Sequence, residues 1–231
     1  MVEQRMPTAF AMDKSPFAAL APAAITTLMD HSRLVTLEAG QFLFTEGDSC
    51  RELHVLASGH VRCYQAREDG REQVVWTFDA PGEIFCLVAA FGTARYVFSA
   101  AAITASRLYV IDVLTVSRLA ATYTPLGLAL LRAVTRQASG LVALVGSLAL
   151  QRVPERIAHL LRDRAMASGL CRGGGAELDR RRFREDEVAS VVGTVRVHVS
   201  RTLRRLARVG AVQLSRDVIR IPDLRALERL G

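Results

Sequence analysis

The 231-residue sequence lacks any CxxC pair among its four cysteines, which are Cys50, Cys63, Cys86 and Cys171. Cysteines this far apart argue against a disulfide framework and against a tetrathiolate metal site, and they fit a reducing cytoplasm. The N-terminal segment lacks a basic stretch followed by an apolar one, so we expect no secretory signal. The longest uncharged stretch, residues 137–151, is too short and too rich in Gly and Ser to span a bilayer, and we expect no membrane partner.

The sequence also lacks the motifs of the common enzyme classes. It contains no GxSxG, no P-loop, no paired carboxylates in a glycine loop and no Cys/His/Asp constellation. We therefore expect a protein that is not an enzyme. The apolar share of 50% excludes wholesale disorder, and the length suits one large domain or two small ones.

The first part of the chain has no net positive charge, whereas the last part is strongly basic. Residues 147–231 contain 18 arginines and no lysine against 10 acidic residues, a net charge of +8, whereas residues 1–146 carry a net charge of −1. A near-neutral front joined to a basic back predicts that only the second part meets a polyanion, and nucleic acid is the favoured one. A solvated basic surface is the alternative that charge alone leaves open.

The front half has the pattern of a small all-β roll or barrel after a short helix over residues 17–29. Apolar runs at 34–37, 42–44, 53–56, 61–64 and 73–78 are each followed by a glycine turn. Short β-rich runs with a turn every 8 to 12 residues are typical of such folds. Glycine supplies the positive φ that tight turns need.

A different period begins near Pro125 and predicts one long helix. Its a/d seam consists of Leu131, Val134, Ala138, Leu141, Val145 and Leu148, at gaps of 3 and 4. Because other faces of this helix are apolar too, one face can cover the roll while the seam meets a second copy. We expect a two-fold symmetric dimer; packing of the helix on its own domain alone is the alternative.

The back half predicts a winged helix-turn-helix. Pro154 suits the first turn of a new helix, which places a junction at residues 150–153. Residues 185–192 predict a short helix with an acidic first turn, and Gly193-Thr194 predicts the turn after it, with Thr194 as N-cap. Residues 195–209 predict a second helix. The side chains that it is expected to bury are Val195, Val199, Leu203 and Leu206. Residues 211–214 and 218–221 then form the wing hairpin.

The second of these helices is expected to lie in the major groove of DNA. Its outward residues are Arg196, Val197, Ser200, Arg201 and Arg204. Arginine can donate two parallel hydrogen bonds to guanine, so Arg196 and Arg201 are the predicted base readers, with Ser200 a weaker one. The remaining arginines are predicted to contact phosphates, although surface ion pairs are the alternative for each. They are Arg180, Arg181, Arg182, Arg204 and Arg205.

The order of these parts resembles the Crp/Fnr family of bacterial transcription regulators. The run GQFLFTEGDSCRELHVLASGHVRCY…DGREQVVWTFDAPGEIF is similar to the cyclic-nucleotide-binding β-roll, and RVPERIAHLL with EVASVVGTVRVHVSRTLRRL is similar to the family's DNA-binding part. The resemblance implies an α+β fold with a jelly-roll-like β-roll (15–124), a dimerisation helix (125–151) and a winged helix-turn-helix domain (152–231). It also implies an allosteric homodimer on a palindromic operator of double-stranded DNA, with RNA polymerase a candidate partner.

Departures from the family pattern concern the effector. Members that bind cyclic AMP carry Gly-Glu and Arg-Ser where this chain has Cys86-Leu87 and Phe98-Ser99, and a Thr-Ser pair where it has Leu141-Val142. A phosphate buried without a cation is costly, so we predict no tight cyclic-nucleotide binding. The remaining pocket is apolar and thiol-lined. Its predicted members are Cys86, Leu87, Val97, Phe98, Ser99 and Leu141.

The other effectors of the family, iron–sulfur clusters and haem, need cysteine or histidine side chains as ligands. Cluster-binding members carry closely spaced N-terminal cysteines, and this chain has none before Cys50. Haem is kept as a minority hypothesis, with His31, His54 and His60 as nominal ligands; otherwise we expect no cofactor and no metal. A ligand-binding module that has lost DNA binding is the remaining alternative. In the recognition helix, Val197 replaces a glutamate of many members and can contact only a thymine methyl.

Overall fold

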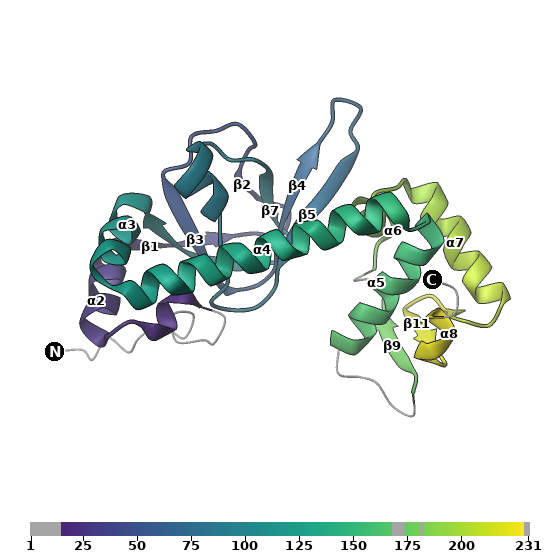
Figure 1. Cartoon of the computed structure of the whole chain (residues 1–231). Coiled ribbons are helices and arrows are strands. Elements are labelled where there is room, and N and C mark those ends of the chain that lie inside the picture. Colours follow the sequence, from purple (N-terminus) through teal and green to yellow (C-terminus); the bar gives the residue numbers. More distant parts are fainter. Residues whose placement is uncertain (1–14, 168–173, 181–182, 229–231) are drawn as a thin grey trace. The chain divides into compact units, whose positions relative to one another are not determined.

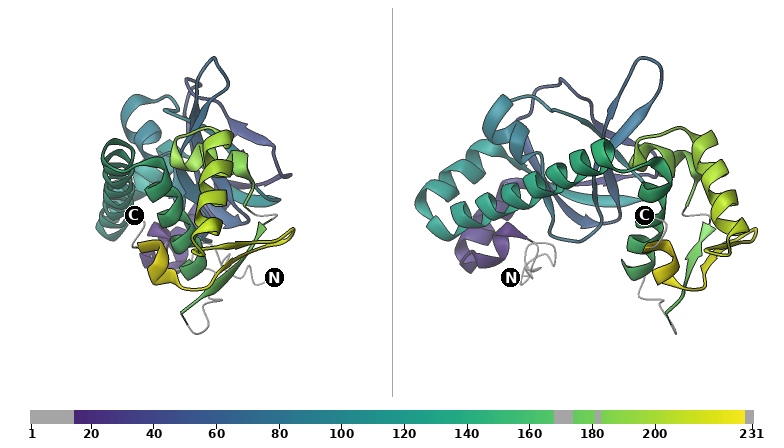
Figure 2. Two further views of the ribbon diagram at one scale, coloured as in Figure 1. Left: turned by 90° about the vertical axis from the view of Figure 1, so that its right-hand side faces the viewer. Right: turned by 45° about the vertical axis from the view of Figure 1, so that its right-hand side comes forward.

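The computed structural model describes residues 15–167, 174–180 and 183–228. The elements form two compact units. One consists of the chain up to Gln65 with Val75–Leu141, and the other of Ala66–Val74 with the chain from Val142 onward. Helix α4 (Thr124–Leu150) passes from one unit to the next as a single unbroken helix (Figures 1 and 2).

Two four-stranded antiparallel sheets make the β-roll of the first unit. Their strand orders are β1-β8-β3-β6 and β2-β7-β4-β5. This arrangement, followed by a long helix and a helix-turn-helix, confirms the predicted α+β class with an N-terminal roll. The strands are β1 (Ser32–Leu37), β2 (Phe42–Phe44), β3 (Glu52–Ser58), β4 (Val61–Ala66), β5 (Glu72–Phe78), β6 (Ile84–Phe85), β7 (Ser99–Ala102) and β8 (Ser106–Asp112).

The core of the roll lies between these sheets. β3 is central in its sheet, and Leu53, Val55 and Leu56 on it have no exposed surface. The turn from β3 to β4 depends on Gly59, which has φ +92°. A Cβ at this position would lie 2.5 Å from the carbonyl oxygen of Ala105, so neither the backbone angle nor the space admits a side chain.

Short helices close the ends of the roll. The helix expected over 17–29 is two elements, a 3-10 turn η1 (Pro16–Ala19) and α2 (Pro22–Asp30). A π-helical turn η2 (Ala89–Thr93) follows β6, and α3 (Val113–Thr122) follows β8. The Asp112 carboxylate caps α3 by accepting the Leu114 N–H at 2.8 Å.

Helix α4 presents one face to the roll. Leu126, Leu130 and Ala133 are buried at gaps of 4 and 3, which is the repeat of one helix face. One turn later, Gln137 Nε2 donates to the carbonyl oxygen of Ile84 at 2.8 Å and ties the helix to β6. The buried face therefore extends from Leu126 to at least Gln137.

The second unit carries the predicted helix-turn-helix and has its own core. Helix α5 packs against α6 and α7, and a three-stranded sheet of order β10-β11-β9 lies beside it (Figure 1). Ile157, Leu161 and Val199 are fully buried there. The elements are α5 (Val153–Ala167), β9 (Ala176–Asp179), α6 (Glu185–Val192), α7 (Arg196–Arg208), β10 (Gln213–Leu214), β11 (Val218–Ile221) and α8 (Leu224–Glu228).

Candidate nucleic-acid interface and effector site

Helices α6 and α7 form the helix-turn-helix. Gly193 ends α6 in the left-handed region at φ +66°, and its N–H donates to the carbonyl oxygen of Ala189. The N-cap of α7 is Val195 and not Thr194, whose hydroxyl lies 3.1 Å from the His198 ring nitrogen instead. The expectation that Val195 is buried is wrong, because the capping position lies ahead of the helix and leaves this side chain 41% exposed.

The two faces of α7 differ sharply in polarity. Val199, Thr202, Leu203 and Leu206 are buried in the core of the second unit. Arginines crowd the opposite face, since 196, 201, 204, 205 and 208 are all exposed arginine positions. An α-helix with one apolar stripe and one strongly cationic face suits the major groove of a polyanionic duplex.

The predicted base readers differ in their surroundings. Arg196 Nε lies 3.4 Å from Glu185 Oε2 and 4.0 Å from Asp186 Oδ1, so the acidic first turn of α6 holds its guanidinium. Arg201 has no hydrogen bond or ion pair with any residue that the structure describes. Of the other candidates, Val197 is 62% exposed, Ser200 is half-buried, Arg204 is exposed, and Arg181 and Arg182 lie outside the described residues.

The wing is the β10–β11 hairpin with β9 along its edge. The Ser215 hydroxyl accepts the Val218 N–H at 3.1 Å and closes the turn. Arg180, predicted to contact phosphate, donates through its guanidinium to the Ser215 carbonyl oxygen and through its N–H to Asp217. Arg216 stands exposed at the hairpin tip. This residue is not among those predicted from the sequence to contact DNA, although its place between two strand-forming runs marks a tip residue.

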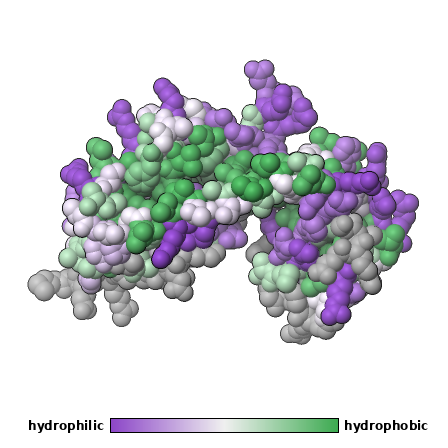
Figure 3. Space-filling model, in the orientation of Figure 1, coloured by the Kyte–Doolittle hydropathy of each residue, from purple (hydrophilic) through white to green (hydrophobic). Residues whose placement is uncertain are grey.

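The predicted seam of α4 lies about 100° around the helix from the face that packs on the roll, because successive residues turn by that angle. Leu131, Ala138, Leu141 and Val145 are exposed, and Figure 3 shows apolar side chains gathered along much of the helix. Val134 packs partly against the roll core, and Leu148 is half-buried. Contiguous exposed apolar surface of this kind is typical of protein–protein or membrane interaction sites.

By length and composition, α4 could also cross a membrane, and it is the one helix among the described residues of which this holds. A single helix of this kind is weak evidence for a span. A soluble helix that packs on a roll and on a second helix has the same composition. The heptad spacing of its exposed residues favours helix-on-helix packing.

The predicted effector residues lie mostly in the packed interior of the roll. Cys86 and Leu87 are buried, and the Cys86 Sγ atom lies 3.6 Å from His54 Nδ1. The buried Ser99 hydroxyl accepts the Glu46 N–H at 3.0 Å. Val97 and Phe98 are half-buried, while Leu141 on α4 is 40% exposed. Leu87 and Phe98 thus stand where cyclic-AMP-binding members carry the glutamate of Gly-Glu and the arginine of Arg-Ser.

The three nominal haem ligands are engaged elsewhere or enclosed. The His31 ring bonds the Thr27 carbonyl oxygen at 2.8 Å, and the His60 ring lies 3.3 Å from the Thr104 hydroxyl. His54 stacks on Phe85 in the core, and burial lowers its pKa to about 3. Within the described residues, no three His, Cys, Asp or Glu side chains gather as metal ligands.

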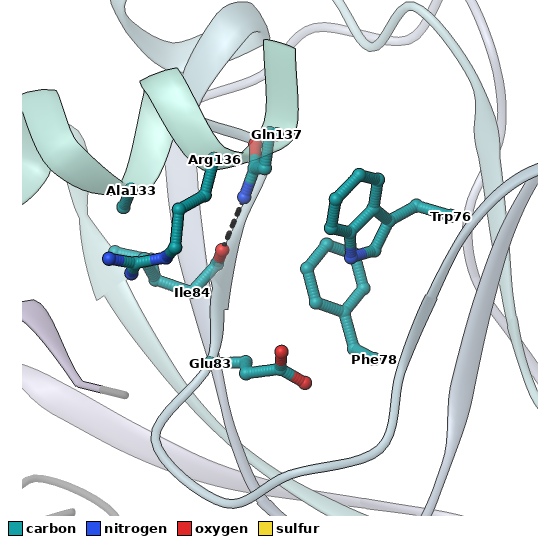
Figure 4. A pocket seen from close by; sticks show the side chains of 7 residues that line it. All are labelled: Trp76, Phe78, Glu83, Ile84, Ala133, Arg136 and Gln137. Carbon is teal, nitrogen blue, oxygen red and sulfur yellow. Dashed lines mark hydrogen bonds between the residues drawn. The ribbon is translucent and has the colours of Figure 1, made fainter. Parts of the chain in front are cut away.

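A cavity of about 270 Å³ opens between the roll and α4 (Figure 4). Its lining comes from β5, from β6 with the turn before it, and from α4. None of the predicted effector residues lines it. The lining residues are Trp76, Phe78, Glu83, Ile84, Ala133, Arg136 and Gln137.

Comparison with known proteins matches both parts of the chain. Residues 34–123 match the family described as cyclic nucleotide-binding domain, and residues 155–230 match the Crp-like helix-turn-helix domain. The chain is 27% identical to the CRP-like cAMP-activated global transcriptional regulator of Mycobacterium tuberculosis, over 92% of this chain and 94% of that protein. It is also 27% identical to the cyclic AMP receptor protein of Thermus thermophilus, over 95% of this chain and 98% of that protein.

A solved structure shares the fold of most of the chain. The crystal structure of a transcriptional regulator of the Crp/Fnr family from Eubacterium rectale is similar at a TM-score of 0.74 with 20% identity. The similarity covers 93% of this chain and 96% of that one. At 20% identity the similarity shows a common fold, with the same order of roll, long helix and helix-turn-helix in both chains.

Proposed function

Since the chain belongs to the Crp/Fnr family of transcription regulators, we propose that it acts as a homodimer on a two-fold symmetric DNA operator. The α7 helix of each subunit enters one major groove. The two grooves lie about one helical turn, roughly 34 Å, apart. The observation that carries the proposal is the exposed arginine face of α7, with Arg201 in no ion pair among the described residues.

Five residues of α7 have a role in this proposal. Arg201 and Arg196 donate to guanine edges, Ser200 assists, and Val197 contacts a thymine methyl. Arg204 and Arg182, the second of which lies outside the described residues, contact phosphates, which position the protein without reading sequence. Arg216 at the wing tip adds a further phosphate contact.

The subunits associate through the α4 seam. Leu131, Ala138, Leu141 and Val145 are exposed on one side of the helix, and a second copy related by a two-fold axis covers them. Val134 and Leu148, which are half-buried, complete that seam. The regulator works in the cytoplasm, where RNA polymerase is a candidate further partner.

Selection of binding sites from random DNA tests the DNA-reading role. Wild-type protein should select an inverted repeat whose half-sites contain a fixed guanine. Arg201→Ala should lose the preference at that guanine and weaken binding by about 1–3 kcal/mol, whereas Arg208→Ala, the matched control, should weaken binding without changing the selected sequence. Failure of the wild-type protein to select any sequence would favour a ligand-binding module without DNA binding.

A cyclic-AMP-responsive regulator is the second candidate, because two relatives carry cyclic AMP in their names. Leu87 and Phe98 stand against it, since neither can hold a ribose hydroxyl or a cyclic phosphate. We propose that this chain does not bind cyclic nucleotides tightly. Low-micromolar affinity for cyclic AMP or cyclic GMP in titration calorimetry would overturn this part of the proposal.

We also propose that the regulator works without haem or a metal. Two of the three nominal ligands are bonded to nearby oxygens and the third is enclosed in the core. Titration with haemin should give no Soret band characteristic of a histidine-bound haem. A band that disappears in His31→Ala, His54→Ala or His60→Ala would establish haem as the cofactor.

A further inference from the structure

We propose that Val195 and Val197, at the start of the recognition helix α7, read the C5 methyl groups of pyrimidines in the major groove of DNA. Because 5-methylcytosine carries this group as thymine does, it should substitute for thymine in the operator. The proposal rests on the DNA-reading role of α7 and names a chemical group that this helix recognises. Its consequence is that methylation of cytosine in an operator strengthens binding.

Val197 lies on the face of α7 that is proposed to meet DNA. Its side chain is 62% exposed, and it precedes Arg201, Arg204 and Arg208 on one outward stripe at gaps of 4, 3 and 4. The buried residues of α7 occupy the opposite side. The first turn of the helix therefore presents an apolar side chain in line with the predicted guanine reader, Arg201.

Val195 is turned outward by the backbone at the N-cap of α7. A helical residue at this position would lie on the side of Val199, four residues later, which has no exposed surface. The cap has φ −115° and ψ 152°, an extended conformation, and Val195 is 41% exposed. Two apolar side chains are thus exposed within one turn, at the start of a helix whose exposed residues are mostly arginine.

Valine is a poor residue for an N-cap, which makes its presence at this position informative. Serine, threonine, asparagine and aspartate are preferred there, because their side chains accept a hydrogen bond from the first turn, and Val195 makes no such bond. The hydroxyl of Thr194, one residue earlier, lies 3.1 Å from the His198 ring instead. Natural sequences break such local rules at functional sites, and contact with DNA supplies a function for this valine.

An aliphatic side chain recognises a methyl group but not a hydrogen-bonding pattern. In the major groove thymine presents an O4 acceptor and cytosine an N4 donor, and valine can pair with neither. The C5 methyl group is the feature of thymine that remains, and 5-methylcytosine carries it at the same ring position. Burial of a group of this size contributes about 0.8 kcal/mol, which is about a fourfold change in affinity.

The spacing along α7 places the methyl groups relative to the guanine. Val197 and Arg201 are four residues apart, about 6 Å along an α-helix, and neighbouring base pairs are about 3.4 Å apart. We therefore expect the pyrimidine read by Val197 about two base pairs from the guanine read by Arg201. Two residues span at most about 7 Å, so the pyrimidine read by Val195 should lie within about two further base pairs.

Operators that differ in a single C5 methyl group test the proposal with the full-length protein. The operator selected by the wild type is prepared with thymine, deoxyuridine, cytosine or 5-methylcytosine at each selected thymine within about four base pairs of the guanine. Fluorescence anisotropy gives the affinities. DNA with deoxyuridine should bind about three- to fivefold more weakly than DNA with thymine, and DNA with 5-methylcytosine about three- to fivefold more tightly than DNA with cytosine.

Val195→Ser and Val197→Ser should each remove the preference for one methyl group and leave the preference for the guanine unchanged. Serine is a preferred N-cap, so Val195→Ser should fold at least as stably as the wild type. Val209→Ser is the matched control, because Val209 is 60% exposed at the other end of α7, and it should keep both methyl preferences.

Three results would overturn the proposal: equal affinity for DNA with and without the methyl group, no selected thymine near the guanine, or unchanged methyl preferences in both valine variants. If one of these occurs while Arg201→Ala loses its guanine preference, α7 reads DNA without reading methyl groups. If the wild type selects no sequence at all, the DNA-reading role fails together with this proposal.

Discussion

The guanidinium of Arg156 donates to the carbonyl oxygen of Gly193, 3.3 Å away, at the turn of the helix-turn-helix. The same side chain donates to the carbonyl oxygens of Leu148 and Gln151, at 3.2 and 3.0 Å. The Leu148 carbonyl belongs to the last turn of α4, where backbone acceptors have no partner within the helix, and Gln151 directly follows the helix. One cation thus joins the end of α4 to the turn that starts the recognition helix.

Arg156→Met should destabilise the protein by about 1.5–3 kcal/mol, because three carbonyl oxygens lose a charged donor. Urea unfolding of the full chain measures this loss. Arg164→Met, an exposed arginine on the same helix, should change stability by less than about 1 kcal/mol. Equal losses in the two variants would mean that the three bonds add nothing to stability.

Glu185→Gln should raise DNA affinity roughly two- to fivefold. The carboxylate of Glu185 holds Arg196 at 3.4 Å, and an exposed pair of this kind is worth less than about 1 kcal/mol. Removal of the charge frees the guanidinium for DNA. Fluorescence anisotropy with a fixed operator measures the gain, and the Arg196→Ala background is its control, since Glu185→Gln should add little there. A gain of the same size in both backgrounds would contradict the proposed release.

The periodic parts of this fold follow from sequence. Alternating apolar runs with glycine turns predict β1 to β5, and a 3–4 repeat predicts α4, because each pattern matches the period of its element. Strand β7 is not predictable in this way. Its residues, Ser99–Ala102, have low β-propensity, and they form a strand because β2 and β4 pair with them on both sides.

The candidate sites likewise have features that the sequence predicts and features that depend on tertiary packing. An outward arginine face is visible in the sequence, since it needs only the helical period. The pairing of Arg196 with Glu185 depends on how α6 meets α7, and the fit of Trp76 against Gly140 joins a strand to a distant helix. Contacts of this kind are set by tertiary packing, so neither the release of Arg196 nor the cavity that Trp76 lines could be read from residue order.

Val145→Asp should convert the proposed dimer into a monomer, because the substitution buries an unpaired carboxylate in the seam. Sedimentation velocity of the full chain gives the mass of each species. Ala143→Asp places the same charge two residues away, on the opposite side of α4 from the seam, and should leave the dimer intact. A dimeric Val145→Asp protein would refute the seam.

The buried His54 predicts a loss of stability in mild acid. Burial foremost, with the charge of Arg33, lowers its pKa from 6.5 to about 3, so the folded protein holds a neutral ring. Between these pH values the unfolded chain binds the additional proton, and the free energy of unfolding therefore falls as the pH falls below about 6.5. The loss from this one group between about pH 7.5 and 5 should be about 2 kcal/mol.

Urea unfolding of the full chain at these two pH values measures the effect. His54→Phe keeps a ring for stacking on Phe85 but has no proton to gain, so its stability should depend less on pH by that amount. His31→Asn, which removes an exposed ring, should keep the wild-type dependence. A His54→Phe protein that loses as much stability in acid as the wild type would show that His54 takes up its proton in the folded state.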